Sequence, residues 1–136
     1  MGHSESGFFP EQAALTNPSR VMGLISIEGQ CTTTLSSSQI GVLAKIPTLV
    51  IFGDHLTGSP GSAGLWQAAF AGCQQFIQQV NSAGGDATML FLPDAGQFGN
   101  SHMLMQDKNN LVVADLILDW IDLHVEKKKG SDHRKK

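Results

Sequence analysis

Three mostly apolar runs of strand length divide the chain, at residues 21–27, 47–53 and 87–92. None of these runs alternates strictly between apolar and polar positions. Uninterrupted apolar runs are typical of parallel strands that are covered by helices on both faces. The pattern therefore predicts a buried parallel sheet of three strands.

Helices are predicted around these strands. Apolar residues recur mostly at spacings of three and four over 64–82 and 110–126, which indicates two amphipathic helices. Another helix should run from the N-terminal segment to about Thr16, and a short helical turn is expected near 40–44. Strands that alternate with helices favour right-handed crossovers, so the predicted fold class is α/β with a parallel sheet.

Charge divides the chain into two parts. Six of the nine basic residues lie in 127–136, which we interpret as a disordered basic tail. Residues 1–126, predicted to form a single domain, hold eleven acids against three bases, a net charge of −8. Such a charge argues against a nucleic-acid partner. No apolar run approaches the roughly 18 residues of a membrane span, so no membrane partner is expected.

Two cysteines, Cys31 and Cys73, could be paired or free. Neighbouring units of the predicted sheet carry them, which would allow a disulfide. They lack the spacing of metal ligands, and the sequence has no His-x-x-x-His pattern. We therefore expect no metal and no cofactor.

The N-terminal residues Gly-His-Ser-Glu-Ser-Gly come close to the nucleophile-elbow pattern G-x-S-x-G, with Ser4 at the centre. Ser6 stands where the last glycine would be, and Gly7 follows one place late. The elbow is a strained turn between a strand and a helix that exposes a serine hydroxyl. His3 should point to the opposite face and pack beneath the turn. The backbone N–H of Glu5 is a candidate oxyanion donor.

A base and an acid for Ser4 follow in the chain order expected of a Ser-acid-His triad. Glu28 directly follows the first predicted strand, Asp54 follows the second, and His102 lies in the loop after the third. The residues alone leave Glu28 and Asp54 as alternative acids. Taken singly, Ser4 could be a helix cap and each acid a loop residue, but their joint order favours a triad.

The stretch around His102, Gly-Asn-Ser-His-Met-Leu-Met-Gln-Asp over 99–107, resembles a bacterial carboxylesterase branch of the α/β-hydrolases. The similarity continues through 109–111 and 114–121, and it includes the elbow and Ser-Ile-Glu-Gly at 26–29. In that branch the triad acid is a glutamate after the sixth strand. The resemblance therefore implies the C-terminal portion of the fold, with strands six to eight.

By this resemblance Ser4 is the nucleophile, Glu28 the acid and His102 the base of a serine esterase that acts on a small-molecule ester. Asp54 remains the competing acid. A complete member would have about five strands before the elbow, so we expect an unpaired edge at 21–27 and little esterase activity from the chain as written. The alternative is a catalytically inactive remnant or interaction module. A homodimer is left open.

Overall fold

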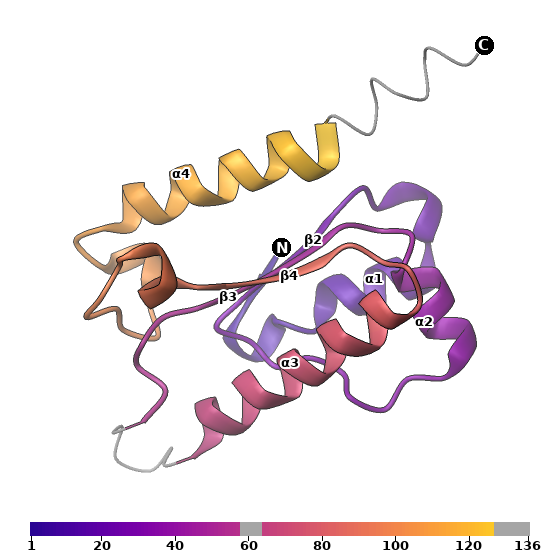
Figure 1. The fold of residues 1–136 in the computed structure, drawn as a ribbon, viewed down its shortest axis with the longest axis horizontal. Helices are drawn as coiled ribbons and strands as arrows, with labels where there is room; N and C mark the ends of the chain where they lie inside the picture. Colours follow the sequence, from indigo (N-terminus) through magenta and orange to yellow (C-terminus); the bar gives the residue numbers. More distant parts are fainter. Residues whose placement is uncertain (58–63, 127–136) are drawn as a thin grey trace.

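The computed structural model describes residues 1–57 and 64–126, in which a parallel sheet lies between helices (Figure 1). The predicted basic tail at 127–136 lies outside the described residues, as does part of the loop that follows Asp54. The strands are β1 (Gly2–His3), β2 (Leu24–Ile27), β3 (Thr48–Phe52) and β4 (Ala87–Phe91). The α-helices are α1 (Phe9–Thr16), α2 (Ser37–Leu43), α3 (Leu65–Ser82) and α4 (Asn110–Ile121).

All four strands are parallel, in the order β1-β2-β3-β4. The prediction of three strands with an unpaired edge at 21–27 is wrong, because Gly2 and His3 form a fourth strand against Ser26 and Ile27. Two residues were too few to show a strand pattern in the sequence. The added strand matters because it runs directly into Ser4 and fixes the direction in which the elbow leaves the sheet.

Successive residues of the strands face opposite sides of the sheet and build two apolar layers. Ile25, Ile27, Leu49 and Ile51 pack toward Val113 and Trp120 of α4. The intervening positions face the other helices, which lie together on the opposite side of the sheet (Figure 1). Every residue of β2 and β3 is buried, as predicted from the uninterrupted apolar runs. The prediction of a buried third strand is only partly right, because in β4 Ala87 is buried and the other four residues are half-buried at the edge of the sheet.

The predicted helix bounds hold with small changes. The helix expected over 110–126 is α-helical only to Ile121 and continues as a π-turn to Glu126. The N-terminal helix begins at Phe9, after a separate 3₁₀ turn over Ser4–Ser6. No helix within the described ranges is long and apolar enough to cross a membrane.

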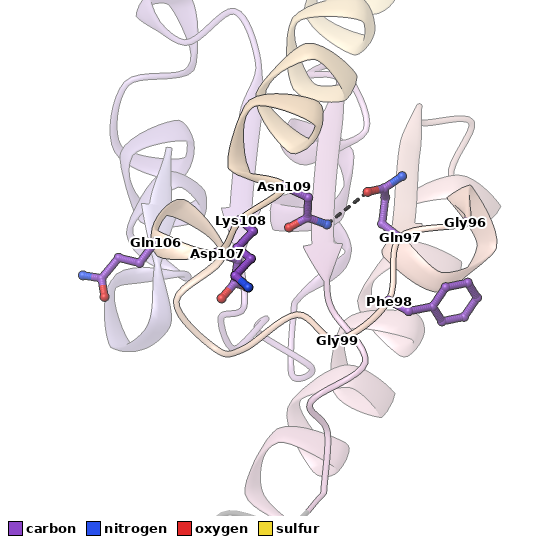
Figure 2. A pocket seen from close by; sticks show the side chains of 8 residues that line it. All are labelled: Gly96, Gln97, Phe98, Gly99, Gln106, Asp107, Lys108 and Asn109. Carbon is purple, nitrogen blue, oxygen red and sulfur yellow. Dashed lines mark hydrogen bonds between the residues drawn. The ribbon is translucent and has the colours of Figure 1, made fainter.

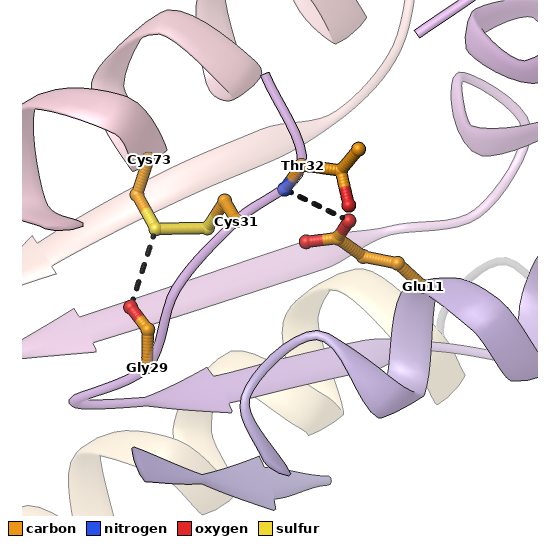
Figure 3. The surroundings of a disulfide bond; sticks show 5 residues. All are labelled: Glu11, Gly29, Cys31, Thr32 and Cys73. Carbon is orange, nitrogen blue, oxygen red and sulfur yellow. Dashed lines mark hydrogen bonds between the residues drawn. A yellow bond between two sulfur atoms is a disulfide. The ribbon is translucent and has the colours of Figure 1, made fainter. Parts of the chain in front are cut away.

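A disulfide joins Cys31 to Cys73, with their Cα atoms 4.9 Å apart (Figure 3). The sequence had left this pair open. The bond connects the segment after β2 to the middle of α3. Beside it, the backbone N–H of Thr32 donates to Oε2 of Glu11 at 3.1 Å, which ties the same segment to α1. Three elements on one side of the sheet are thereby held together.

Candidate active site

Ser4 lies at a sharp turn directly after β1. Its φ of 57° falls in the left-handed region that residues other than glycine rarely adopt. Gly2 is needed before it, because a Cβ there would collide with the backbone carbonyl of Ser6. The hydroxyl of Ser6 donates to the carbonyl oxygen of His3 at 2.8 Å and accepts from its N–H at 3.1 Å. A serine in place of the last glycine therefore helps to close the turn.

The turn also packs closely against the segment that follows β2. A Cβ on Gly7 would lie 2.5 Å from the Cα of Gly29, so only glycine at both positions lets the two backbones approach this closely. This contact brings Ser4 and Glu28, which precedes Gly29, into the same region.

Glu28 follows β2 with a φ of 47° and is completely buried. Its Oε1 accepts a hydrogen bond of 2.5 Å from the backbone N–H of Gly53. Burial raises the pKa of this carboxyl to about 7. The hydrogen bond from Gly53 opposes the rise, and the charges of Asp107 and Asp54 add to it.

His102 faces both of these side chains. Its Nε2 lies 2.9 Å from Oγ of Ser4, and its Nδ1 lies 3.4 Å from Oε2 of Glu28. The first distance is that of a good hydrogen bond, and the second is long for one. Burial lowers the pKa of His102, and the nearby His3 and His55 lower it further.

Asp54, the alternative acid, has a different set of partners. Its two carboxylate oxygens accept from the backbone N–H groups of Gly99 and Asn100, each at 2.8 Å. Asp54 therefore holds the loop that carries His102, while the Glu28 carboxylate is the one that faces the imidazole. As the resemblance around His102 implied, Glu28 rather than Asp54 approaches His102.

The loop around His102 is braced by further polar contacts. Asp107 accepts from both the N–H and the hydroxyl of Ser101, each at 2.8 Å. The buried Asn100 donates to Oδ1 of Asn109 at 2.8 Å. These bonds cross the loop and fix the position of the residue next to His102.

Several hollows lie near this loop and the elbow, and two of them bear on where a substrate could lie. The larger, of about 780 Å³, lies between 96–99 and 106–109, where the Asn109 amide donates to Gln97 at 3.0 Å (Figure 2). Neither Ser4 nor His102 lines it. A second hollow of about 500 Å³ adjoins the elbow and is the better candidate for a substrate. Its lining residues are Glu5, Ser6, Phe8, Phe9 and Gln30.

Two contacts of His102 were not predicted from the sequence. His3 does not simply pack beneath the turn, because its Nε2 donates to the carbonyl oxygen of His102 at 2.8 Å. Trp66, predicted only as part of an apolar helix face, stacks on the imidazole of His102 with ring centroids 3.9 Å apart. Its spacing in the sequence shows a helix face, but not what the first turn of that helix contacts.

No group of three or more His, Cys, Asp or Glu side chains suited to a metal ion occurs in the part of the chain that the structure describes. Glu5 is exposed and directly follows Ser4 in the 3₁₀ turn. Its backbone N–H thus stays a candidate oxyanion donor.

No protein-family model matches the chain. Over 79 residues it is 32% identical to a probable secreted lipase, phiG, from a fungal species (strain ATCC 74256), an alignment that covers 58% of this chain and 19% of the lipase. The solved structure of a novel bacterial esterase superposes with a TM-score of 0.80 and 42% identity, over 90% of this chain and 37% of the esterase.

These likenesses, together with the four-stranded parallel sheet and its flanking helices, confirm the α/β fold class. They also confirm the resemblance to the esterases of the α/β-hydrolase superfamily, and they are consistent with the C-terminal portion of that fold. The chain spans just over a third of the length of the solved esterase and about a fifth of the lipase.

Proposed function

We propose that this chain carries the Ser-His-Glu catalytic triad of a serine hydrolase acting on small-molecule carboxylic esters. The observation that carries the proposal is the contact of His102 with Ser4 on one side, at 2.9 Å, and with Glu28 on the other, at 3.4 Å. The three residues are separated by at least 24 positions in the sequence. The likeness to a bacterial esterase and to a probable secreted lipase supports an ester as the substrate.

The geometry suits acyl transfer. With a proton on Nδ1 of His102 facing Glu28, Nε2 is free to accept the hydroxyl proton of Ser4. As the new bond forms between Oγ and the carbonyl carbon, the proton passes to Nε2. The imidazolium then gives this proton to the leaving alkoxide oxygen as the ester C–O bond breaks. Water attacks the acyl-enzyme by the same route and releases the acid.

The environment of Glu28 suits its proposed role. Above its pKa of about 7 the Glu28 carboxyl is ionised, and a buried carboxylate next to the imidazolium stabilises the charge that develops on His102 during the reaction. The lowered pKa of His102 keeps the imidazole neutral near pH 7, as a general base must be. The backbone N–H of Glu5 would stabilise the developing oxyanion.

A fluorophosphonate probe tests the proposal, because the hydroxyl oxygen of an activated serine attacks its phosphorus, displaces fluoride and becomes covalently phosphonylated. We expect the probe to modify the 136-residue chain at Ser4, as mapped by mass spectrometry of the peptides, and the Ser4→Ala variant to remain unmodified. Mapping distinguishes Ser4 from Ser6, two positions away. Ser19→Ala, an exposed serine outside the site, is the matched control and should label like the wild type.

A chain that folds but is not modified at Ser4 would contradict the proposal. That outcome would favour the alternative, a catalytically inactive hydrolase remnant or interaction module in which Ser4 only begins a turn.

A further inference from the structure

Two aromatic rings lie close to the imidazole of His102. The indole of Trp66, from the first turn of α3, stacks on it at a centroid distance of 3.9 Å and an interplanar angle of 28°. The ring of His3 lies 4.9 Å away at a tilt of 36°. An indole face packed on an imidazole restricts rotation of that ring and covers one of its faces from water.

The stacking of Trp66 matters because the two ring nitrogens of His102 are not held equally well. Nε2 has a good partner in Ser4, whereas the contact of Nδ1 with Glu28 is long, at 3.4 Å. Backbone contacts such as that of His3 with the carbonyl of His102 fix the main chain but not the χ angles of the side chain. Stacking is thus the contact best placed to hold the ring plane.

The helix that carries Trp66 is itself anchored beside the site. Cys73, seven residues or about two helical turns further along α3, is joined by the disulfide to Cys31. Cys31 follows Glu28 by three positions. The stacking residue and the segment that starts at the triad acid are therefore covalently connected through a short path.

We propose that Trp66 is a positioning residue, whose indole holds the imidazole of His102 in the orientation that directs Nε2 at Ser4. The inference rests on the proposed function. It adds a fourth side chain to the site, one that acts on the reaction only through His102.

Indole fluorescence tests the stack independently of any reaction, because a protonated imidazole quenches an indole on which it stacks. The chain has two tryptophans, so the measurement uses a Trp120→Phe background, in which Trp66 is the only indole. Fluorescence should fall as the pH drops through the titration of His102. Adding His102→Gln should abolish the fall, although His3, His55 and Glu28 remain close to the site.

The rate at which the fluorophosphonate modifies Ser4 tests the positioning. Trp66→Leu keeps an apolar side chain but removes the ring, and it should slow modification at least tenfold, since misplacement by about 1 Å costs roughly a hundredfold. Trp66→Phe retains a ring and should restore most of the rate. Gln67→Ala, an exposed residue of the same helical turn, is the matched control and should react like the wild type.

The possible failures are distinguishable. If the pH dependence of Trp66 fluorescence is the same with and without His102, the indole does not stack on the imidazole in solution. Equal rates in the wild type and Trp66→Leu would overturn only the role of Trp66, leaving the triad intact. A wild type that is never modified at Ser4 would overturn the proposed function and the positioning role together.

Discussion

Replacing Glu28 with glutamine should stabilise the protein at neutral pH and slow the reaction of Ser4. Glutamine has nearly the same size as glutamate and keeps an oxygen that can accept from the N–H of Gly53, but it carries no charge. The side chain is completely buried, and burial raises the carboxyl pKa from 4.5 to about 7. At any pH at which it is ionised, the wild-type Glu28 carboxylate therefore destabilises the folded protein.

The sign and size of the effect follow from this pKa. Between pH 4.5 and about 7 the carboxyl is ionised in the unfolded chain but still protonated in the folded one, so stability falls as pH rises. Each pKa unit corresponds to about 1.4 kcal/mol, which gives a loss of about 3 kcal/mol that is complete just above pH 7. Glu28→Gln should lack this loss.

Urea unfolding of the wild type and Glu28→Gln at several pH values from 4.5 to 8 measures the difference. His102 contributes with the opposite sign, because its lowered pKa makes stability fall as the pH drops below 6.5. Since His102 is present in both chains, the difference between them isolates Glu28. A difference in unfolding free energy that stays constant over this range would refute the reasoning.

The same variant should react poorly. An amide N–H₂ facing Nδ1 of His102 favours the tautomer with the proton on Nε2, which cannot accept a proton from Ser4, and the comparable change in a serine protease costs roughly 10⁴-fold. Glu11→Gln is the matched control, because burial also raises the pKa of that carboxyl. It should become more stable at neutral pH and still be modified at Ser4 at the wild-type rate.

Four further outcomes are expected. Replacing both Cys31 and Cys73 with serine should cost about 4 kcal/mol of unfolding free energy, from the entropy of a loop of 42 residues; equal urea midpoints with and without the disulfide would contradict this. The Gly7→Ala variant should lose roughly 1–3 kcal/mol of unfolding free energy or fail to fold, because the new Cβ would lie 2.5 Å from the Cα of Gly29. Thermal unfolding of the variant and the wild type measures this loss of stability. Asp54→Asn should slow modification by the fluorophosphonate far less than Glu28→Gln does, since it loosens the loop but leaves the triad; a loss as large as that of Glu28→Gln would return Asp54 to the role of acid. Turnover of 4-nitrophenyl acetate by the chain should be weak, because the N–H of Glu5 is the one candidate oxyanion donor identified among the described residues, and removal of one such donor costs an enzyme roughly 10²- to 10³-fold; robust turnover abolished by Ser4→Ala would disprove this.

The sequence determined the fold class and most of the element bounds. Uninterrupted apolar runs are typical of strands covered on both sides, and β2 and β3 are buried at every position, whereas β4 at the sheet edge is mostly half-buried. The order of Ser4, Glu28 and His102 along the chain indicated a shared edge of the sheet, because parallel strands present their carboxyl ends at the same edge. The resemblance around His102 selected Glu28, and the observed contacts agree with that choice.

Only the tertiary structure decided what depends on contacts between distant segments. β1 exists because two residues pair with β2, and a strand of two residues has no periodicity to detect. Trp66 lies on His102, and Asp54 holds the loop before His102. Local pattern shows which face of a helix or which end of a strand a side chain occupies. It cannot show which partner lies there, because packing in three dimensions sets that partner.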